Sequence, residues 1–458
     1  MPFRRSCLAV LVFAVASRAA GGEGGSPPAP DPVLQGLIDE ALERNPALAA
    51  ARGMEAAAGA QPAQAGSRPG PMLGLFYEND GAAFSLGREP MTRLGVTVAQ
   101  ELPYPGKLAG RRQLAAADAA IAGFDVERAR LTLIASVKRA YYGLVLSRGL
   151  ASLALQHRDV WREIQETARV RYASTAGGQQ ELLRAQVEGT RLQALHAQHH
   201  AEARARLAQL NALLSRPVDA PMETPVALEA TVEERPREEI VAWTQAHSPE
   251  LRAAELAVER EQRAWALAGF EGKPDFAVQG GYMNRGSLPL MWQVGATVSL
   301  PSRSRARAAL AEADARRMAS RARLEDIRIR LQAAVEQRLA LIQAADEIAR
   351  TYRDGLLPQL DLAVRSALSR YAAGQATQAS VLEASAAVIE DRTDYLRILA
   401  TRAAEQARLE EASLEDPVGI DSLLMHGRGG ASGMGSMPPA GDGMNATEAR
   451  SNARMEAR

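Results

Sequence analysis

The stretch TRLGVTVAQELPYPGKL at residues 92–108 joins a predicted β-strand to a predicted helix. Leu94, Val96 and Val98 alternate with glycine, threonine and alanine, which is the two-residue period of a strand. Beyond the Pro-Gly of this stretch, residues 106–172 contain no proline, which predicts one uninterrupted helix. At about 1.5 Å per residue, such a helix is roughly 100 Å long. The sequence therefore predicts a rod or duct and not a globular domain.

The same unit occurs twice in the chain. Three pairs of markers recur in the same order, namely Asn45-Pro46 with Ser248-Pro249, Gly95 with Gly295, and Arg171-Tyr172-Ala173 with Arg370-Tyr371-Ala372. Their offsets are 203, 200 and 199 residues, and three ordered matches at nearly one spacing indicate an internal duplication. The unit is a helix, a β-hairpin, a long helix, a turn and a helix.

The two predicted hairpins lie at residues 72–101 and 274–300. The second long helical stretch, residues 302–372, contains a single proline, Pro358. Its apolar residues from Leu324 to Tyr352 recur every 3.5 residues on average, which is the coiled-coil period. The predicted fold is mainly α with a small membrane β part. The residues expected on one face of the second hairpin are Phe276, Val278, Gly280, Tyr282, Val294, Ala296, Val298 and Leu300.

The ends and the middle of the chain differ in composition from the repeats. Arg4 and Arg5 precede an apolar run, as in a secretory signal, and the last stretch is rich in glycine and methionine without an apolar period. The predicted segments are a signal peptide at 1–20, a linker at 21–32, a first repeat at 33–216, a linker at 217–235, a second repeat at 236–415 and a disordered tail at 416–458.

Composition argues against several classes of function. The 54 basic and 54 acidic residues are spread along the chain and give no basic patch for nucleic acid. Cys7 is the only cysteine and lies in the predicted signal, so the mature chain has no disulfide. No run of about 18 or more apolar residues follows it, so any membrane contact must be made by strands. No catalytic motif stands out, and we expect no enzyme.

Four short strands are too few to close a pore, since bacterial membrane barrels begin at about eight strands. An open sheet edge cannot face lipid, because its backbone groups would have no hydrogen-bond partners there. Several copies must therefore share one wall, and three copies would supply twelve strands continued by a cylinder of helices. Tyr77, Tyr282 and Trp292 suit an aromatic girdle at a membrane surface, and Tyr104 suits either the girdle or a buried position.

The sequence resembles the TolC family of outer membrane efflux proteins over residues 33–415. The motifs are LERNPAL at 42–48, ELPYPGKL at 101–108, RYASTAGGQQELLRAQ at 171–186 and GLLPQLDLAVRSALSRYAAG at 355–374. The resemblance implies a homotrimer, a β-barrel in outer membrane lipid, and an α-helical barrel that reaches through the periplasm. It also implies a membrane fusion protein as adaptor and an inner-membrane pump of the RND type. ELPYPGKL is similar to the heavy-metal branch related to CzcC and CusC, although the acylated cysteine of many relatives is missing.

The resemblance places functional side chains at the tips of the helical hairpins. Glu181 would form a ring of carboxylates near the periplasmic aperture of a trimer and attract cations there. The alternative is an ordinary acidic residue that stabilises a helix N-terminus. Arg171, Tyr172, Arg370 and Tyr371 are expected to contact neighbouring helices and the adaptor, or else only to pack at helix C-termini.

Two groups of residues are weak candidates for metal ligands. His196, His199 and His200 have the spacing of one helical face, and neutral imidazoles bind zinc or copper, but a solvated face explains them as well. Met434 and Met437 offer soft thioethers suited to Cu(I), but a low-complexity tail with incidental methionines is the preferred explanation. We assign no metal site, and we expect no resident cofactor.

We expect an outer membrane channel subunit of a tripartite efflux system. It would passively conduct metal cations or small toxic compounds from the periplasm to the exterior. Two alternatives stay open. A type I protein-secretion channel would share the architecture, whereas a periplasmic coiled-coil adaptor or scaffold would have long helices without repeated lipid-facing hairpins.

Overall fold

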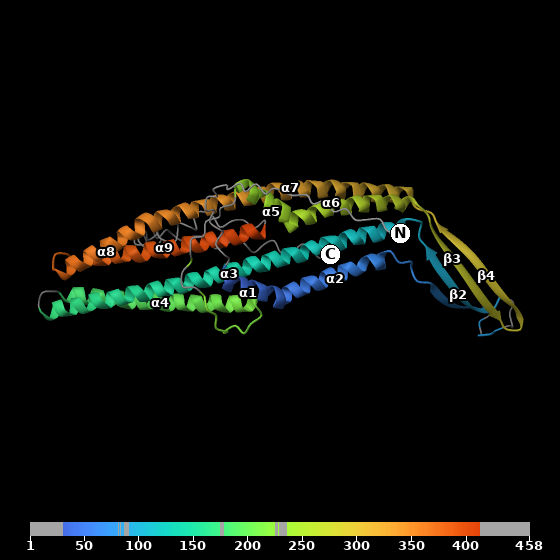
Figure 1. Ribbon diagram of the computed structural model, residues 1–458. Coiled ribbons are helices and arrows are strands. Elements are labelled where there is room, and N and C mark those ends of the chain that lie inside the picture. Colours follow the sequence, from blue (N-terminus) through green and yellow to red (C-terminus); the bar gives the residue numbers. More distant parts are fainter. Residues whose placement is uncertain are drawn as a thin grey trace, which may run out of the picture. The chain divides into compact units, whose positions relative to one another are not determined.

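The computed structural model describes residues 31–80, 82, 84–86, 91–174, 178–224, 228 and 236–412 (Figure 1). Two predicted segments lie outside the described residues, namely the signal peptide and the tail with Met434 and Met437. Of the first predicted linker, at 21–32, only the last two residues are described. The described chain is mainly helical and has one four-stranded antiparallel sheet, as the sequence predicts.

The first repeat contains four helices and two strands. Asn45 accepts hydrogen bonds from the backbone N–H groups of Ala47 and Leu48, and Pro46 takes the first helical position, so the predicted helix start is confirmed. The elements are α1 (Pro32–Arg44), α2 (Pro46–Ala65), β1 (Met72–Glu78), β2 (Arg93–Leu102), α3 (Lys107–Ala173) and α4 (Gln179–Leu213).

The second repeat has the same order of elements. Ser248 caps α6 through the N–H of Leu251, which confirms the second predicted start. The elements are α5 (Arg237–His247), α6 (Pro249–Ala268), the 3-10 turn η1 (Gly269–Gly272), β3 (Asp275–Arg285), β4 (Leu288–Ser299), α7 (Arg303–Thr351), the π-helical turn η2 (Tyr352–Leu356), α8 (Leu357–Ala372) and α9 (Gln378–Glu411).

The second long helix is interrupted, which corrects the expectation of one helical stretch over residues 302–372. The interruption is η2, which ends two residues before Pro358. Proline lacks the N–H that would bond to the carbonyl of residue 354, and its ring clashes with that carbonyl in a regular α-helix. A π turn shifts the bonding by one residue and relieves the clash. α3 has no internal proline and runs unbroken for 67 residues.

The four strands lie in the order β1-β2-β3-β4, so β2 and β3 join the two repeats in one sheet. Register places Leu75, Val96, Tyr282 and Trp292 side by side in one row across all four strands. On the other face, a Cβ added to Gly95 would lie 2.4 Å from the ring of Phe76, so this position needs glycine. The predicted alternation of the strands is confirmed.

The junction between β2 and α3 ties the repeats together a second time. Lys107 is buried and forms a 2.7 Å ion pair with Asp275, the first residue of β3. The same carboxylate accepts the backbone N–H of Tyr104 at 2.8 Å. Gly106 has φ of 100°, and a Cβ there would lie 2.9 Å from Phe270, so both backbone conformation and space require glycine.

The helices beyond the sheet pack in a definite lateral order. α4 packs on α3, α3 on α9, and α9 on α8, so α4 and α8 are the outer members of this series (Figure 1). Trp161 of α3 donates a 3.1 Å hydrogen bond to the hydroxyl of Ser385 on α9, inside a cluster that also buries Ile164 and Val381. The contact between α3 and α9 therefore joins the helical parts of the two repeats.

Candidate functional site

One face of the sheet is apolar and exposed. Leu75 is 77% exposed and Trp292 is 76% exposed. An exposed apolar surface of this extent marks a region that meets a membrane or another protein. The face comprises Leu73, Leu75, Tyr77, Leu94, Val96, Val98, Phe276, Val278, Tyr282, Trp292, Val294, Ala296 and Val298.

The opposite face is dominated by small and polar residues. Thr97, Gln279 and Gln293 lie on it with several glycines, while their neighbours in sequence point to the apolar face. Apolar residues on one face and polar residues on the other are typical of strands that separate lipid from water. Within the described residues, no strand pairs with the outer edge of β1 or of β4.

Three of the aromatic residues expected at a membrane surface lie at one end of the sheet. Tyr282 and Trp292 are direct cross-strand partners, and Tyr77 stacks on Phe84 with 4.7 Å between ring centres. Tyr104 lies at the other end, half-buried, with its ring 6.3 Å from that of Phe270. The structure thus places Tyr104 in the β2–α3 junction. The prediction of an aromatic girdle then applies only to Tyr77, Tyr282 and Trp292.

Three of the five residues expected at the helical tips come together. Arg171 ends α3, Glu181 begins α4, and Tyr371 ends α8. The guanidinium of Arg171 lies 5.2 Å from the ring centre of Tyr371, within cation–π range. The Glu181 carboxylate is 3.8 Å from the Arg171 guanidinium and 3.5 Å from the Tyr371 hydroxyl. We call Arg171, Glu181 and Tyr371 the tip cluster.

The tip cluster combines a buried ring with a half-exposed ion pair. Tyr371 is 2% exposed, and burial, followed by the nearby charge of Glu181, raises the pKa of its hydroxyl. The two contacts to Glu181 are at the long end of the hydrogen-bond and ion-pair range, so a small movement of either helix breaks them. Tyr172 and Arg370 are exposed and lie outside the cluster.

The three histidines that the sequence offers as weak candidates have different environments in the structure. His199 is buried and bonded to Glu202 at 2.9 Å, His196 bonds to the carbonyl of Ala151 at 3.2 Å, and His200 is exposed. The expected solvated face is therefore wrong for His199, because the coiled coil buries it against α3. In the part of the chain that the structure describes, no three His, Cys, Asp or Glu residues are grouped to hold a metal ion.

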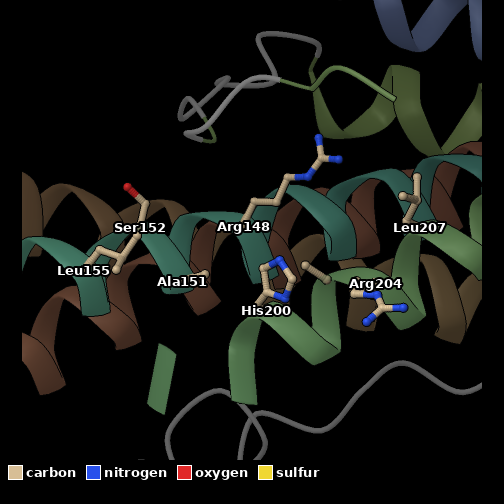
Figure 2. A pocket seen from close by; sticks show the side chains of 8 residues that line it. Arg148, Ala151, Ser152, Leu155, His200, Arg204 and Leu207 are labelled. Atoms are coloured by element: carbon tan, nitrogen blue, oxygen red, sulfur yellow. The ribbon is translucent and has the colours of Figure 1, made fainter. Parts of the chain in front are cut away.

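A groove between α3 and α4 is lined by Arg148, Ser152, His200 and Arg204, together with alanines and leucines (Figure 2). Figure 2 shows Arg148 directed away from His200 and Arg204, toward the segment that follows α4. Arg148 donates there to the carbonyl of Met222 at 2.9 Å and to the hydroxyl of Thr224. The basic groups do not converge on one point, so we assign no ligand to this groove.

His157 is a buried titratable group that the sequence did not single out. It lies on α3, is 8% exposed, and lies near the ion pair of Arg392 and Asp361, which are 2.8 Å apart on α9 and α8. Burial, helped by the charge of Arg392, lowers the pKa of His157 to about 4. The ring is therefore neutral at pH 7. A lone histidine in a coiled coil gives no sequence signal of its burial.

Comparison with known proteins gives a family and a fold. The family model described as outer membrane efflux protein matches residues 37–216 and 243–413. A search of curated sequences returned no significant match. None of the helices in the described ranges has the length and apolar character needed to cross a bilayer.

Solved structures of outer membrane channels share the fold. VceC of Vibrio cholerae is 20% identical with a TM-score of 0.71, over 83% of this chain and 95% of that one. The open state of MtrE of Neisseria gonorrhoeae is 22% identical with a TM-score of 0.66, over 83% and 88%. CusC is 17% identical with a TM-score of 0.69, over 84% and 92%. CusC is no more similar than the other two, so the comparison does not single out one branch.

The pKa of His157 predicts a specific pH dependence of stability. Because the pKa falls from 6.5 to about 4 on folding, the neutral ring contributes stability above pH 6.5 that is lost as the pH falls through about 4. This contribution is about 3 kcal/mol. In detergent, the free energy of unfolding of His157→Gln should fall less between pH 7 and pH 4 than that of the unchanged chain. Unfolding followed by circular dichroism at each pH measures this difference. His247→Gln, at an exposed position on α5, is the matched control. Equal pH dependence of His157→Gln and the unchanged chain would contradict the assignment.

Proposed function

Because the chain belongs to the outer membrane efflux protein family, we propose that it is one subunit of an outer membrane channel that conducts substrates passively out of the periplasm. The observation that carries the proposal is the sheet with an exposed apolar face, a polar face and two unpaired outer edges within the described residues. A periplasmic scaffold would have no reason to expose such a face.

The number of copies follows from the width that a channel needs. Two copies would supply eight strands, and side chains fill the interior of a barrel of about that size. Three copies supply twelve strands, which widens the interior beyond side-chain reach. The homotrimer is therefore the smallest closed wall that leaves an aqueous path, with β4 of one copy paired to β1 of the next. The polar face of Thr97, Gln279 and Gln293 would line this path.

The tip cluster supports a role in opening the periplasmic end. It joins α3 and α4 of the first repeat to α8 of the second, through one cation–π contact and two long polar contacts. Breaking the contacts of Glu181 would weaken the link between the two helical hairpins at their tips. Three such carboxylates around a threefold axis would also favour cations. The repeat counterpart of Glu181 is Ser380, so the ring would have three acidic positions and three hydroxyl positions.

The substrate class and partners are extensions of the same proposal. The acidic ring would suit metal cations, and small toxic compounds remain an alternative cargo. A passive duct needs an energy source elsewhere, so we propose a periplasmic adaptor of the membrane fusion type and an inner-membrane pump of the RND type. Arg370 and Tyr172 are exposed at the tips and are our candidates for contact with the adaptor.

The channel proposal predicts discrete conductance steps when the purified protein is added to planar lipid bilayers. Glu181→Gln should retain the channel and lower its preference for cations, because the proposed ring then loses its three carboxylate charges. Glu188→Gln, which removes the same charge seven residues further along α4, should change the preference less. Absence of any channel would contradict the proposed function, whereas an unchanged ion preference in Glu181→Gln would remove only the gate role.

The adaptor proposal predicts that charge reversal at the tip weakens complex formation. Arg370→Glu should reduce recovery of a co-expressed periplasmic adaptor of the membrane fusion type when the channel is affinity-purified from membranes. Arg350→Glu makes the same change on α7, twenty residues before Arg370, and should leave recovery unchanged. Equal recovery with both variants would show that Arg370 does not contact the adaptor.

A further inference from the structure

The chain passes between the sheet and the helices at four crossings, and basic residues are concentrated there. With the adjoining helix ends, the crossings are residues 66–71, 103–112, 269–275 and 300–311. They contain eight basic and two acidic residues, although the whole chain has equal numbers of each. The turns at the other end of the sheet, residues 79–92 and 286–287, contain one basic and two acidic residues. The excess of positive charge is therefore confined to the end of the sheet that joins the helices.

Most of this positive charge is exposed. Of the eight basic side chains, Lys107 is buried in its ion pair with Asp275, and the other seven are exposed. Among the described residues, Arg303, Arg305 and Arg307 form no ion pair. We call the seven exposed residues the basic collar, namely Arg68, Arg111, Arg112, Lys273, Arg303, Arg305 and Arg307.

The basic collar is continuous from the first crossing to the fourth. A Cβ added to Gly66 would lie 3.0 Å from the Cβ of Arg112, so the first crossing lies beside the second. The close approach of the β2–α3 junction to η1, described above, joins the second crossing to the third. A Cβ added to Gly272 would lie 3.7 Å from that of Ala306, which joins the third crossing to the fourth. The collar is thus one band along the end of the sheet.

The arginines at the start of α7 do not stabilise the helix itself. Arg303 is the first residue of α7, and the first turn of this helix has no acidic residue. Basic residues near a helix N-terminus oppose the helix dipole. Arg303 and Arg307 are also like charges four residues apart, a spacing that destabilises a helix. An anion bound between these side chains would remove both costs, so their placement favours an anionic ligand.

The basic collar borders the exposed apolar face of the sheet. Leu300 is 84% exposed and lies three residues before Arg303, and Phe276 is 39% exposed and lies three residues after Lys273. A ligand that fits both surfaces carries hydrocarbon next to a negatively charged group, which is the chemistry of a phospholipid. A nucleic acid or an acidic protein would neutralise the collar but would leave Leu300 without an apolar partner.

We infer that the basic collar binds the phosphate groups of anionic phospholipids at the membrane surface nearest the helices. The inference rests on the proposed outer membrane channel and names a lipid partner of its wall. Guanidinium groups hold phosphate oxygens through paired, charge-assisted hydrogen bonds, and each basic residue adds to the attraction of an anionic leaflet. A zwitterionic headgroup carries its own ammonium group, which the collar repels. The collar therefore prefers lipids with a net negative charge, such as phosphatidylglycerol.

Lipid binding to the purified full chain tests the inference. In a neutral detergent, native mass spectrometry counts the phosphatidylglycerol and phosphatidylethanolamine molecules bound at increasing lipid concentrations. Arg303→Gln with Arg305→Gln should weaken phosphatidylglycerol binding at least about tenfold and leave phosphatidylethanolamine binding unchanged. The matched control, Arg321→Gln with Arg323→Gln, removes two exposed charges eighteen residues farther along α7. Eighteen residues are five helical turns, so the control lies on the same faces about 27 Å away, beyond the reach of the headgroup charges.

Two further measurements keep the test independent of the folding of the glutamine pair. Arg303→Lys with Arg305→Lys retains both charges and should retain the preference for phosphatidylglycerol, with the helical content of the unchanged chain by circular dichroism. Raising the ionic strength from about 0.1 M to about 1 M shortens the screening length from about 10 Å to about 3 Å. The preference of the unchanged chain should therefore fall several-fold.

The outcomes separate this inference from the channel proposal. Equal weakening by the glutamine pair and its control, a preference that does not respond to salt, or displacement of phosphatidylglycerol by millimolar inorganic phosphate would overturn the lipid assignment. Channels in planar bilayers, formed by a chain that does not prefer phosphatidylglycerol, would overturn the assignment and leave the proposed function standing. A retained preference without channels would overturn the proposed function and support the basic collar as a lipid site.

Discussion

The unpaired edges of a four-stranded sheet are the constraint on which this structure depends. Backbone N–H and C=O groups along the outer sides of β1 and β4 lack strand partners within the described chain. In the hydrocarbon region of a membrane no water can replace such partners, and each unsatisfied group costs several kcal/mol. The exposed row from Leu75 to Trp292 nevertheless requires an apolar environment. In the proposed channel both demands are met together by copies that join edge to edge, so membrane insertion and assembly would depend on one another.

The duplication makes that assembly geometrically simple, and the contacts between the repeats make each subunit a single unit. β2 pairs with β3, Lys107 of the first repeat binds Asp275 of the second, and Trp161 bonds to Ser385. A ring of three such subunits alternates first and second repeats around its wall. Among the described residues, a π turn occurs only in the second repeat, and a carboxylate in the first turn of the tip helix occurs only in the first.

The sequence was sufficient for features that depend on local pattern. Alternation at Leu94, Val96 and Val98 predicted a strand, Asn45 and Pro46 predicted a helix start, and both are confirmed. The pairing of β2 with β3 could not be predicted from the sequence, because register between segments about 180 residues apart depends on tertiary packing. The π turn was also missed, since Pro358 signals an interruption without specifying its geometry.

The candidate site also has features that the sequence predicted and features that it did not. Arg171, Glu181 and Tyr371 were identified one by one from the turn motifs, but their convergence depends on the packing of α3 against α9. His157 was missed because burial between helices cannot be read from one position of a coiled coil. The spacing of the three histidines of α4 predicted that they share one helical face. In the structure, however, His199 is buried and His200 is exposed to solvent. The position of each histidine around the helix, and not its residue type, therefore decides whether its side chain is buried.

Hydrogen–deuterium exchange of the strand amides in detergent tests the central claim most directly. If copies share one wall, the outward-pointing amides of β1 and β4 are bonded to the neighbouring copy and should exchange as slowly as those of β2 and β3. Rapid exchange confined to the outer edges of β1 and β4, with β2 and β3 protected, would show that the edges are open and would contradict the shared wall.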